Sequence, residues 1–462
     1  MSLSSSPHEP QFAAFIGLDW ADKGHVWALQ VAGSTQRERG QLKHTPEDIE
    51  SWAVEWATRF GGRPVAIALE QSRGALLWAL SKYPHVVLFP VHPTTSYQYR
   101  KAMFPSGSKD DPRDADLLLD LVTLHRDRLR PLEPDTEQTR KLQSLVEKRR
   151  QLVDQRTAQT NRITDQLKLY FPQVLNWFDD LATPMVAAFL QRWPTLSQLQ
   201  AEDAEQVCSF FHQHGSRSQA RIEQRLQQIR NAKAPITDGA IIDPGMLMVG
   251  TLLAVVAALN TGIRALEQAI QSVSATHPDY PIFSSFPAAG PVMAPRLVAA
   301  FGTQRDRYPD VTRMASFSGI APLQQASGRQ CTVHFRWACP KFLRQTFHEY
   351  AALSIPRCAW ARAFYNTQKK DRRKGHHAAV RALAFKWIRI MFRCWHTRQP
   401  YREDLYLAAR EGRAVHFTRP DQPTPSRASN SRTQLSLPPC AKDEDFGLRK
   451  VGDILKSLMA QP

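Results

Sequence analysis

Apolar positions at strand spacing and at helix spacing alternate along the N-terminal quarter of the chain. Runs typical of strands occur at 15–19, 25–31, 36–43, 65–69 and 86–91. Runs typical of helices occur at 46–60, 74–82 and 114–124. The resulting order, βββαβαβα, is the order of an RNase H-like fold, although many α/β domains show a similar alternation.

The remainder of the chain has mainly helical patterns. Residues 136–170 are rich in Gln, Arg and Lys and predict one long helix. Unpaired, this helix would expose an apolar stripe, so we expect either a coiled-coil partner from another subunit or packing within the chain. The apolar stretch from Met246 to Leu259 is shorter than the roughly 18 residues that cross a bilayer, which predicts a buried helix and no membrane contact.

These patterns predict an architecture of α/β plus mostly α. The expected segments are an α/β domain at 12–130, a coiled-coil and helical insert at 136–279, a mainly helical domain at 280–408, and a tail at 418–462. The tail is rich in Ser, Pro, Arg and Gln, and we expect it to be disordered.

Charge narrows the choice of partner. The chain has 60 Lys plus Arg against 43 Asp plus Glu, a formal net charge of +17 and an isoelectric point near 9.8. Such a charge attracts phosphate backbones without selecting a particular nucleic acid, and a basic protein with no such partner would have the same composition. The six cysteines are scattered and the N-terminus lacks the pattern of a signal peptide, which predicts a reducing, cytoplasmic location.

Four acidic residues occur where a metal-dependent nuclease of this architecture would need them. Asp19 ends the first apolar strand and Glu70 ends the buried strand VAIALE, so both carboxylates could face one spot. Asp111 and Asp114 begin the last helix of the domain, and their three-residue spacing puts them on one helical face. Phosphodiester cleavage uses two divalent ions about 4 Å apart, which activate the attacking oxygen and stabilise the leaving one, and hard oxygen ligands suit Mg²⁺.

Ordinary structural roles for the same acids stay open. Asp111 and Asp114 could be N-cap and first-turn acids favoured by the helix dipole, and Asp19 a turn residue. Spacing alone does not separate the helix pair from Asp110 and Asp116. The combination of two strand ends and a helix start, in this order, favours the metal site.

The strings GLDWADKGH, LEQSRG and KDDPRDA resemble the DEDD transposases of the insertion-sequence one-ten family, whose N-terminal domain is like the RuvC resolvase. The resemblance implies two Mg²⁺ ions bound by Asp19, Glu70, Asp111 and Asp114. Two positions depart from the family pattern, Asp110 where Thr or Ser is usual and Ala75 where an aromatic residue often follows the glycine turn. Neither change removes an implied ligand.

A second string, GIAPLQQASGR, resembles the C-terminal transposase domain of the same family. The matching positions are Gly319, Pro322, Ser327 and Gly328. The resemblance implies that Ser327 is a nucleophile that forms a covalent phosphoserine with DNA. A serine needs a metal or a base beside it, which the carboxylates could supply only if the two domains meet.

Basic and aromatic residues surround this serine. Phe335 and Trp337 alternate with basic residues expected to contact nucleic acid, which are Arg329, Arg336, Lys341 and Arg344. A solvated surface would give the same run. Upstream, 285–302 looks like half of a helix-hairpin-helix, a phosphate-binding motif, with Ala288 where glycine is typical.

Cys331, His334, Cys339 and His348 invite a zinc interpretation. Without C-x-x-C spacing, packed cysteines and a surface histidine are the favoured interpretation.

The resemblance covers 12–130 and 280–408 and implies a DNA recombinase that excises and inserts its own element. It also implies a structured bridge RNA as guide, a homodimer or homotetramer with the 136–170 helix as contact, and a location at the bacterial nucleoid. Two other functions remain open. One is a Holliday-junction nuclease with no covalent serine step, and the other is a nucleic-acid-binding protein whose acids are structural.

Overall fold

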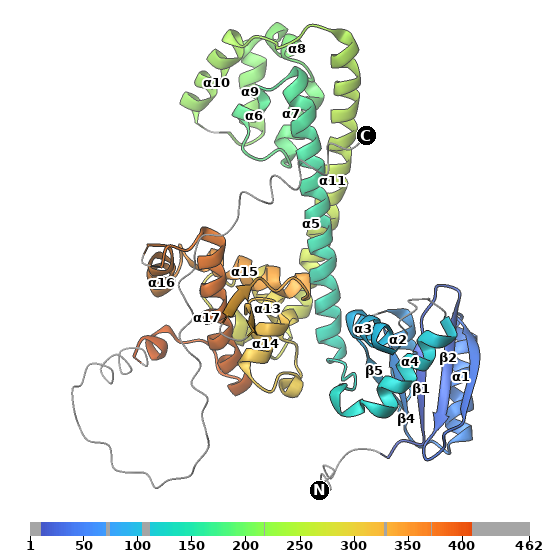
Figure 1. Cartoon of the computed structure of the whole chain (residues 1–462). Coiled ribbons are helices and arrows are strands. Elements are labelled where there is room, and N and C mark those ends of the chain that lie inside the picture. The colour runs from blue at the N-terminus through green and yellow to red at the C-terminus, as the bar shows by residue number, and fades with distance from the viewer. Residues whose placement is uncertain are drawn as a thin grey trace, which may run out of the picture. The chain divides into compact units, whose positions relative to one another are not determined.

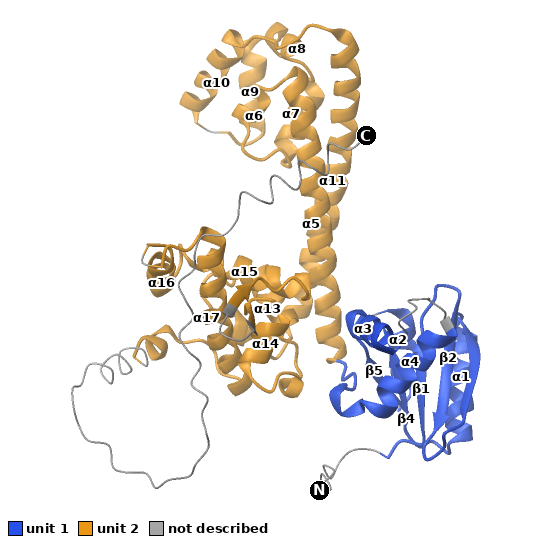
Figure 2. Cartoon of the chain, viewed as in Figure 1, with its two compact units in different colours: residues 1–134 blue, residues 135–462 orange. Residues whose placement is uncertain are grey.

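The computed structural model describes residues 11–70, 74–103, 111–216, 218–327, 330–370 and 372–408. The chain divides between Pro134 and Asp135 into two compact units, each with its own core (Figures 1 and 2). The candidate carboxylates lie in unit 1 and the candidate serine lies in unit 2.

Unit 1 is built on a mixed five-stranded sheet in the order β3-β2-β1-β4-β5. The strands are β1 (Ala14–Asp19), β2 (Gly24–Val31), β3 (Arg37–Lys43), β4 (Val65–Leu69) and β5 (Val86–Pro90). The first three form an antiparallel meander, and β4 and β5 add to β1 in parallel. The element order predicted from the sequence is confirmed, with one additional helix, α3 (Pro93–Met103).

The two faces of this sheet carry side chains of different size. On one face, Ile16 and Ile67 pack with α1 (Pro46–Arg59) and α2 (Ala75–Ser81). On the other face, Ala28, Ala66 and Ala68 pack against α4 (Asp111–Leu124). Small residues on the second face allow the backbone of α4 to approach the sheet closely. A short 3₁₀ turn, η1 (Arg126–Arg128), follows α4.

Unit 2 is organised around two long helices, α5 (Glu137–Tyr170) and α11 (Gly239–Ala275), which pack along each other. The long helix predicted at 136–170 is therefore confirmed, and its apolar stripe packs within the chain, one of the two alternatives that the sequence left open. At Gly262 of α11 the helices come so close that an added Cβ would lie 3.1 Å from Leu152 Cδ1 of α5.

Each end of the α5–α11 pair carries a separate hydrophobic core. Leu142 and Val146 of α5 belong to the core formed with the C-terminal elements, and Ile163 and Leu167 belong to the core formed with the insert. The insert helices are α6 (Val174–Trp177), α7 (Pro184–Arg192), α8 (Leu196–Ala201), α9 (Ala204–Gln213) and α10 (Gln219–Asn231).

The C-terminal elements form a helical bundle with one β-hairpin. The helices are α12 (Tyr280–Ser284), α13 (Met293–Phe301), η2 (Arg305–Arg307), α14 (Val311–Phe317), α15 (Lys341–Ser354), α16 (Ala359–Lys370) and α17 (His376–Thr397). The hairpin consists of β6 (Leu323–Ser327) and β7 (Gln330–His334). Within the 285–302 segment, every residue of α13 is buried, so this helix belongs to the core of the bundle.

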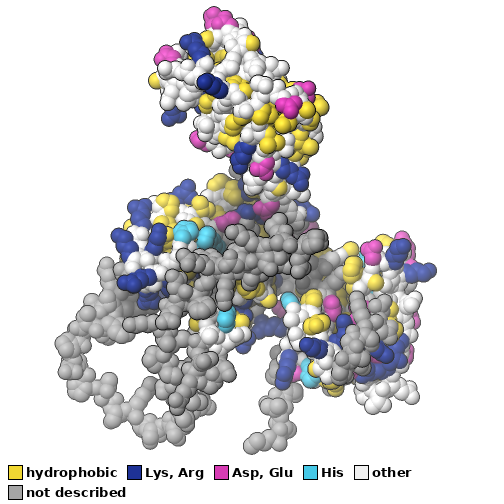
Figure 3. Space-filling view, turned by 45° about the horizontal axis from the view of Figure 1, so that its top comes forward, with side chains coloured by type: hydrophobic (Ala, Val, Ile, Leu, Met, Phe, Trp, Pro, Cys, Tyr) yellow, Lys and Arg dark blue, Asp and Glu magenta, His cyan; other side chains and the backbone are white. Residues whose placement is uncertain are grey.

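α11 is long and apolar enough to cross a membrane by length and composition, but it packs as a core helix on α5. The helix predicted at 246–259 is part of α11, of whose most apolar window 28% is buried. Hydrophobic side chains gather on the surface of the lobe that α6 to α11 form (Figure 3). The large exposed ones on α11 are Ile241, Leu247, Met248 and Val255.

Candidate active site

Asp19 and Glu70 lie side by side at the ends of two parallel strands. β1 and β4 pair with Leu18 opposite Leu69, so Asp19 and Glu70 are the next residues on neighbouring strands. Both side chains are half-buried. The sequence predicted this juxtaposition from the element order alone.

Asp114, on α4, lies at the same cavity as Asp19 and Glu70, because α4 packs directly on β1 at Gly17. A Cβ at Gly17 would be 2.0 Å from the carbonyl oxygen of Ala115 and 2.3 Å from the backbone nitrogen of Leu119. Glycine is therefore required here for steric reasons, a requirement that the hydrophobic pattern of the sequence does not reveal. Asp114 is buried, with 4% of its surface exposed.

These three carboxylates line one cavity of about 500 Å³. Trp20 and Tyr97, 40% and 56% exposed, lie at the same cavity and give it an aromatic rim. Asp111 is the first residue of α4, and its side chain lies outside the described part of the chain, as does all of Asp110. The structure therefore brings three of the four predicted acids together.

Asp116, which spacing could not separate from the other acids, does not line the cavity. Its carboxylate accepts from Arg39 Nη2 at 3.0 Å and lies 3.6 Å from Arg37 Nη1, both on β3. These ion pairs give Asp116 a structural role between α4 and the edge of the sheet.

Two residues of α3 contact two of the acids. Neither of these α3 residues was predicted from the sequence. Arg100 Nε lies 2.8 Å from Asp114 Oδ1, and the Ser96 hydroxyl donates a hydrogen bond to Glu70 Oε1. Arg100 also lines the cavity. Proline at the first position of α3 was the available sequence signal for this helix.

A pair of histidines holds the loop that follows Asp19. The backbone N–H of Ala21 donates to His25 Nδ1 at 3.2 Å, and His25 Nε2 lies 2.9 Å from His44 Nδ1. Burial first, and the neighbouring His44 second, lower the pKa of His25 from 6.5 to about 4. His25 is fully buried, so its neutral form is part of the structure around neutral pH.

The donor chemistry of the cavity fits a hard divalent cation, since three carboxylates converge on it. Among the described side chains, however, no group of three or more His, Cys, Asp or Glu is close enough to hold an ion. The Arg100–Asp114 pair and the Ser96–Glu70 hydrogen bond account for part of this spacing, because they hold two carboxylates on protein partners. Any cation bound by Asp114 would therefore compete with the Arg100 guanidinium for this carboxylate.

Ser327 is the last residue of β6, opposite Gln330 across the β6–β7 hairpin. Its side chain, and the whole of Gly328 and Arg329, lie outside the described residues. Gly319, in the same motif, has φ of 72°, and a Cβ there would be 2.3 Å from Cys339 Sγ. Glycine is therefore required at position 319 for two structural reasons, the left-handed backbone conformation and the close packing against Cys339.

Three of the four predicted nucleic-acid contacts, Arg336, Lys341 and Arg344, follow β7, and the fourth, Arg329, lies outside the described residues. Arg344 and Arg381 each place a guanidinium 5.0 Å from the Phe335 ring centroid. The Trp337 ring lies 4.8 Å from the Phe335 ring and is 79% exposed. Lys341 begins α15 and is exposed, whereas Arg336 is half-buried. A mostly exposed tryptophan that packs on Phe335, the ring that both arginines contact, is a surface on which a nucleobase can stack.

An α/β unit with a carboxylate-lined cavity fits a nucleic-acid-cleaving enzyme, and comparison with known proteins identifies the chain as a transposase. Residues 16–172 match a transposase family of the DEDD kind, and residues 280–366 match the "Transposase IS116/IS110/IS902 family". The chain belongs to this IS110/IS116 family of transposases, enzymes that cleave and transfer DNA strands at a metal-dependent active site.

Whole-length relatives support the same assignment. The chain is 25% identical to the mini-circle putative transposase for IS117 of Streptomyces coelicolor, over 87% of this chain and 98% of the relative. It is 24% identical to the 44.8 kDa protein of insertion element IS116 of Streptomyces clavuligerus, over 82% and 93% of the two chains. For the 42 kDa protein of IS900 of Mycobacterium paratuberculosis the identity is 24%, over 80% and 87%.

Proposed function

We propose that unit 1 is an RNase H-like catalytic domain in which Asp19, Glu70, Asp111 and Asp114 bind two Mg²⁺ ions. The observation that carries this proposal is the single cavity lined by Asp19, Glu70 and Asp114. When bound, the ions would activate the attacking oxygen and stabilise the leaving one. Arg100 holds Asp114 until then, and on release its guanidinium is free to bind a DNA phosphate beside the cavity.

The proposed strand-transfer step uses Ser327 of unit 2. Its hydroxyl oxygen attacks a backbone phosphorus, so that an O–P bond to serine forms while the P–O bond to one deoxyribose breaks. The serine proton passes to a base, and the departing deoxyribose oxygen takes up a proton. Rejoining reverses these events with the hydroxyl of another strand, so no external energy source is needed. The assignment of this role to Ser327 rests on the family resemblance of the string GIAPLQQASGR.

The proposed partners are DNA and a structured bridge RNA. The charge of +17 supports polyanion binding, and the RNA rests on the family resemblance. We place the basic contacts at Arg329, Arg336, Lys341 and Arg344, around the exposed Trp337. With such partners the enzyme would act at the nucleoid in the bacterial cytoplasm.

We also propose that copies of the chain associate as a homodimer or homotetramer. The expected contact, the α5 stripe, packs on α11 of the same chain. The surface of α11 is a better candidate, because Ile241, Met248 and Val255 are exposed at seven-residue spacing. Seven-residue spacing of apolar side chains is the pattern by which two helices pair.

A recombination assay in cells tests the catalytic proposal. A donor plasmid carries the element ends with flanking non-coding DNA, and a second plasmid carries the target. Wild type is compared with Asp19→Asn and Ser327→Ala, and with the matched controls Asp22→Asn, from the same loop, and Ser316→Ala, from α14. We expect joined product from wild type and both controls, and none from the two site variants.

The other outcomes separate the alternatives. Joined product from Ser327→Ala would refute the phosphoserine step and favour a resolvase-like nuclease. Full activity of Asp19→Asn would refute the metal site and leave nucleic-acid binding by the basic surface as the function.

A further inference from the structure

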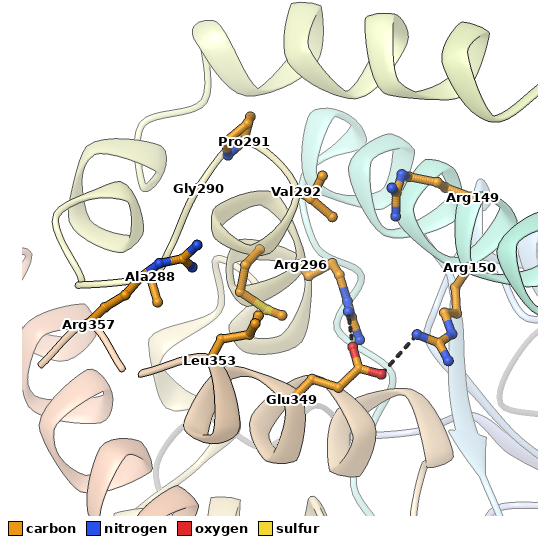
Figure 4. A pocket seen from close by; sticks show the side chains of 11 residues that line it. Arg149, Arg150, Ala288, Gly290, Pro291, Val292, Arg296, Glu349, Leu353 and Arg357 are labelled. Atoms are coloured by element: carbon orange, nitrogen blue, oxygen red, sulfur yellow. Dashed lines mark hydrogen bonds and ion pairs between the residues drawn. The ribbon is translucent and has the colours of Figure 1, made fainter. Parts of the chain in front are cut away.

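A second cavity, in unit 2, is lined by arginines from three separate elements (Figure 4). Its volume is about 330 Å³. Arg149 and Arg150 come from α5, Arg296 from α13, and Arg357 from the turn between α15 and α16. The transposase site in unit 1 and the predicted contacts after β7 include none of these residues.

The carboxylates around this cavity do not neutralise all of its arginines. Glu349 is the one acid in the lining, and it is shared between Arg296 Nη1 at 2.5 Å and Arg150 Nη1 at 2.9 Å. From outside the lining, Glu267 accepts from Arg149, and Asp154 lies 2.9 Å from Arg150 Nη2. Four guanidinium groups therefore face three carboxylates. Since Glu349 is already held by two arginines, it does not repel an incoming anion as a free carboxylate would.

Two arginines keep donors available. Arg296 is 95% buried, and its Nε is enclosed without a hydrogen-bond partner among the described residues. Arg357 is exposed and makes no ion pair or side-chain hydrogen bond with the described part of the chain. A buried donor without a partner is costly, and an acceptor entering the cavity would remove that cost.

The hairpin between α12 and α13 adds backbone donors at the edge of the cavity. Ala288 adopts a left-handed conformation, with φ of 67°, and the Tyr350 hydroxyl fixes the hairpin by donating to the carbonyl of Pro287 at 2.9 Å. Within the described residues, the N–H groups of Gly290 and Val292 donate no hydrogen bond. Free N–H groups at the start of a helix favour an anion.

We propose that this arginine pocket binds one phosphate of a DNA strand. The inference deepens the proposed function, on which it rests, by adding a phosphate subsite in unit 2. Guanidinium groups and backbone N–H groups are the donors with which proteins bind the oxygens of a phosphate.

The rim of the pocket favours a nucleic-acid phosphate over a free inorganic ion. Val292 and Leu353 line it and are 37% and 41% exposed. Apolar side chains beside the arginines offer van der Waals contact to a sugar, which an inorganic ion cannot use. Between the two nucleic acids, the membership of the chain in a transposase family favours DNA.

The test measures DNA affinity, without divalent cation, so that no strand is cut. Fluorescence anisotropy with a labelled duplex of the element end is followed over a range of salt concentrations. The variant is Arg357→Ala, which removes no ion pair or side-chain hydrogen bond within the described chain, and Arg357→Lys is the conservative variant. The matched control is Arg230→Ala on α10, an exposed arginine with the same charge change.

We expect Arg357→Ala to weaken binding about five- to tenfold and to reduce the slope of log K against log salt by about one, as the loss of one phosphate contact does. Arg357→Lys should recover part of the affinity, and Arg230→Ala should match wild type. Inorganic phosphate, added at constant ionic strength, should compete with DNA for wild type more than for Arg357→Ala.

Three results would overturn the proposal. Equal affinity and slope for Arg357→Ala and Arg230→Ala would mean that the pocket is only an ion-pair cluster between α5, α13 and α15. A loss seen with an RNA of the same sequence, but not with DNA, would assign the pocket to RNA. Failure of wild type to bind DNA at all would overturn the proposed function together with the pocket, whereas the first two results leave the proposed function intact.

Discussion

Lowering the pH from 7 to 5 is expected to loosen the loop that follows Asp19, because His25 holds this loop only in its neutral form. The N–H of Ala21 donates to His25 Nδ1, so that nitrogen must be unprotonated. The ring proton is then on Nε2 and donates to His44 Nδ1. Protonation of His25 would break the bond from Ala21 and place a charge in a fully buried site.

The size of the effect follows from the pKa of His25, which is lowered from 6.5 to about 4. Because the folded-state pKa is depressed, the unfolded chain takes up a proton first as the pH falls. The stability contribution of neutral His25 is therefore complete above about pH 6.5 and is lost progressively between that value and about pH 4. The full loss corresponds to about 3 kcal/mol, of which about 2 kcal/mol falls between pH 7 and pH 5.

Hydrogen–deuterium exchange of peptides from β1 and β2, corrected for the intrinsic pH dependence of amide exchange, measures this loss. We expect amides that exchange through unfolding of unit 1 to be less protected at pH 5 than at pH 7 by about 20-fold. The control is His25→Gln, which keeps a donor and an acceptor but does not titrate. An equal pH dependence in this variant and in wild type, or a His25 ring that titrates near pH 6.5 by NMR, would refute the reasoning.

Three further substitutions probe the packing and charge of the two units. Gly17→Ala should destabilise unit 1 by about 3 kcal/mol or more in chemical denaturation, whereas Gly24→Ala, whose Cβ would lie 3.6 Å from the nearest atom, should be tolerated. Asp135→Asn should destabilise unit 2 by about 3 kcal/mol at neutral pH. Burial raises the pKa of Asp135, but Arg307 and Thr303 together hold it below 3.8, so this contribution persists above that pH and is lost only on further acidification. Arg100→Ala should raise the affinity of the protein for Mn²⁺, measured by calorimetric titration, about tenfold, because the substitution removes a competing cation beside Asp114. An unchanged affinity would argue against Asp114 as a ligand.

The sequence predicted the strands and most helices of unit 1 because their hydrophobic pattern is local. It missed α3 because this helix has little hydrophobic pattern to detect, and Ser96 is its one buried residue among those described. Because α3 was not predicted, the contacts of Arg100 with Asp114 and of Ser96 with Glu70 were not predicted either. These contacts depend on where α3 lies in space.

Long-range packing was the second limit on prediction. The composition of 136–170 requires a partner for its apolar stripe but does not say which helix supplies it, and α11 is far along the chain. The apolar stretch at 246–259 has the composition of a buried helix, yet Leu247 is 75% exposed. An apolar sequence predicts that a side chain is buried. It does not predict whether another part of the same chain or a second molecule buries it.

The geometry of the candidate site depends on small residues more than on the acids themselves. Gly17, Ala66 and Ala68 leave room for α4 against the sheet, and that close approach brings Asp114 into the cavity at the ends of β1 and β4. A larger residue at Gly17 would displace α4 while leaving every carboxylate in the sequence. Gly17 is therefore a positioning residue of the site. Substitutions there should abolish strand transfer because they displace α4, and the same displacement destabilises unit 1.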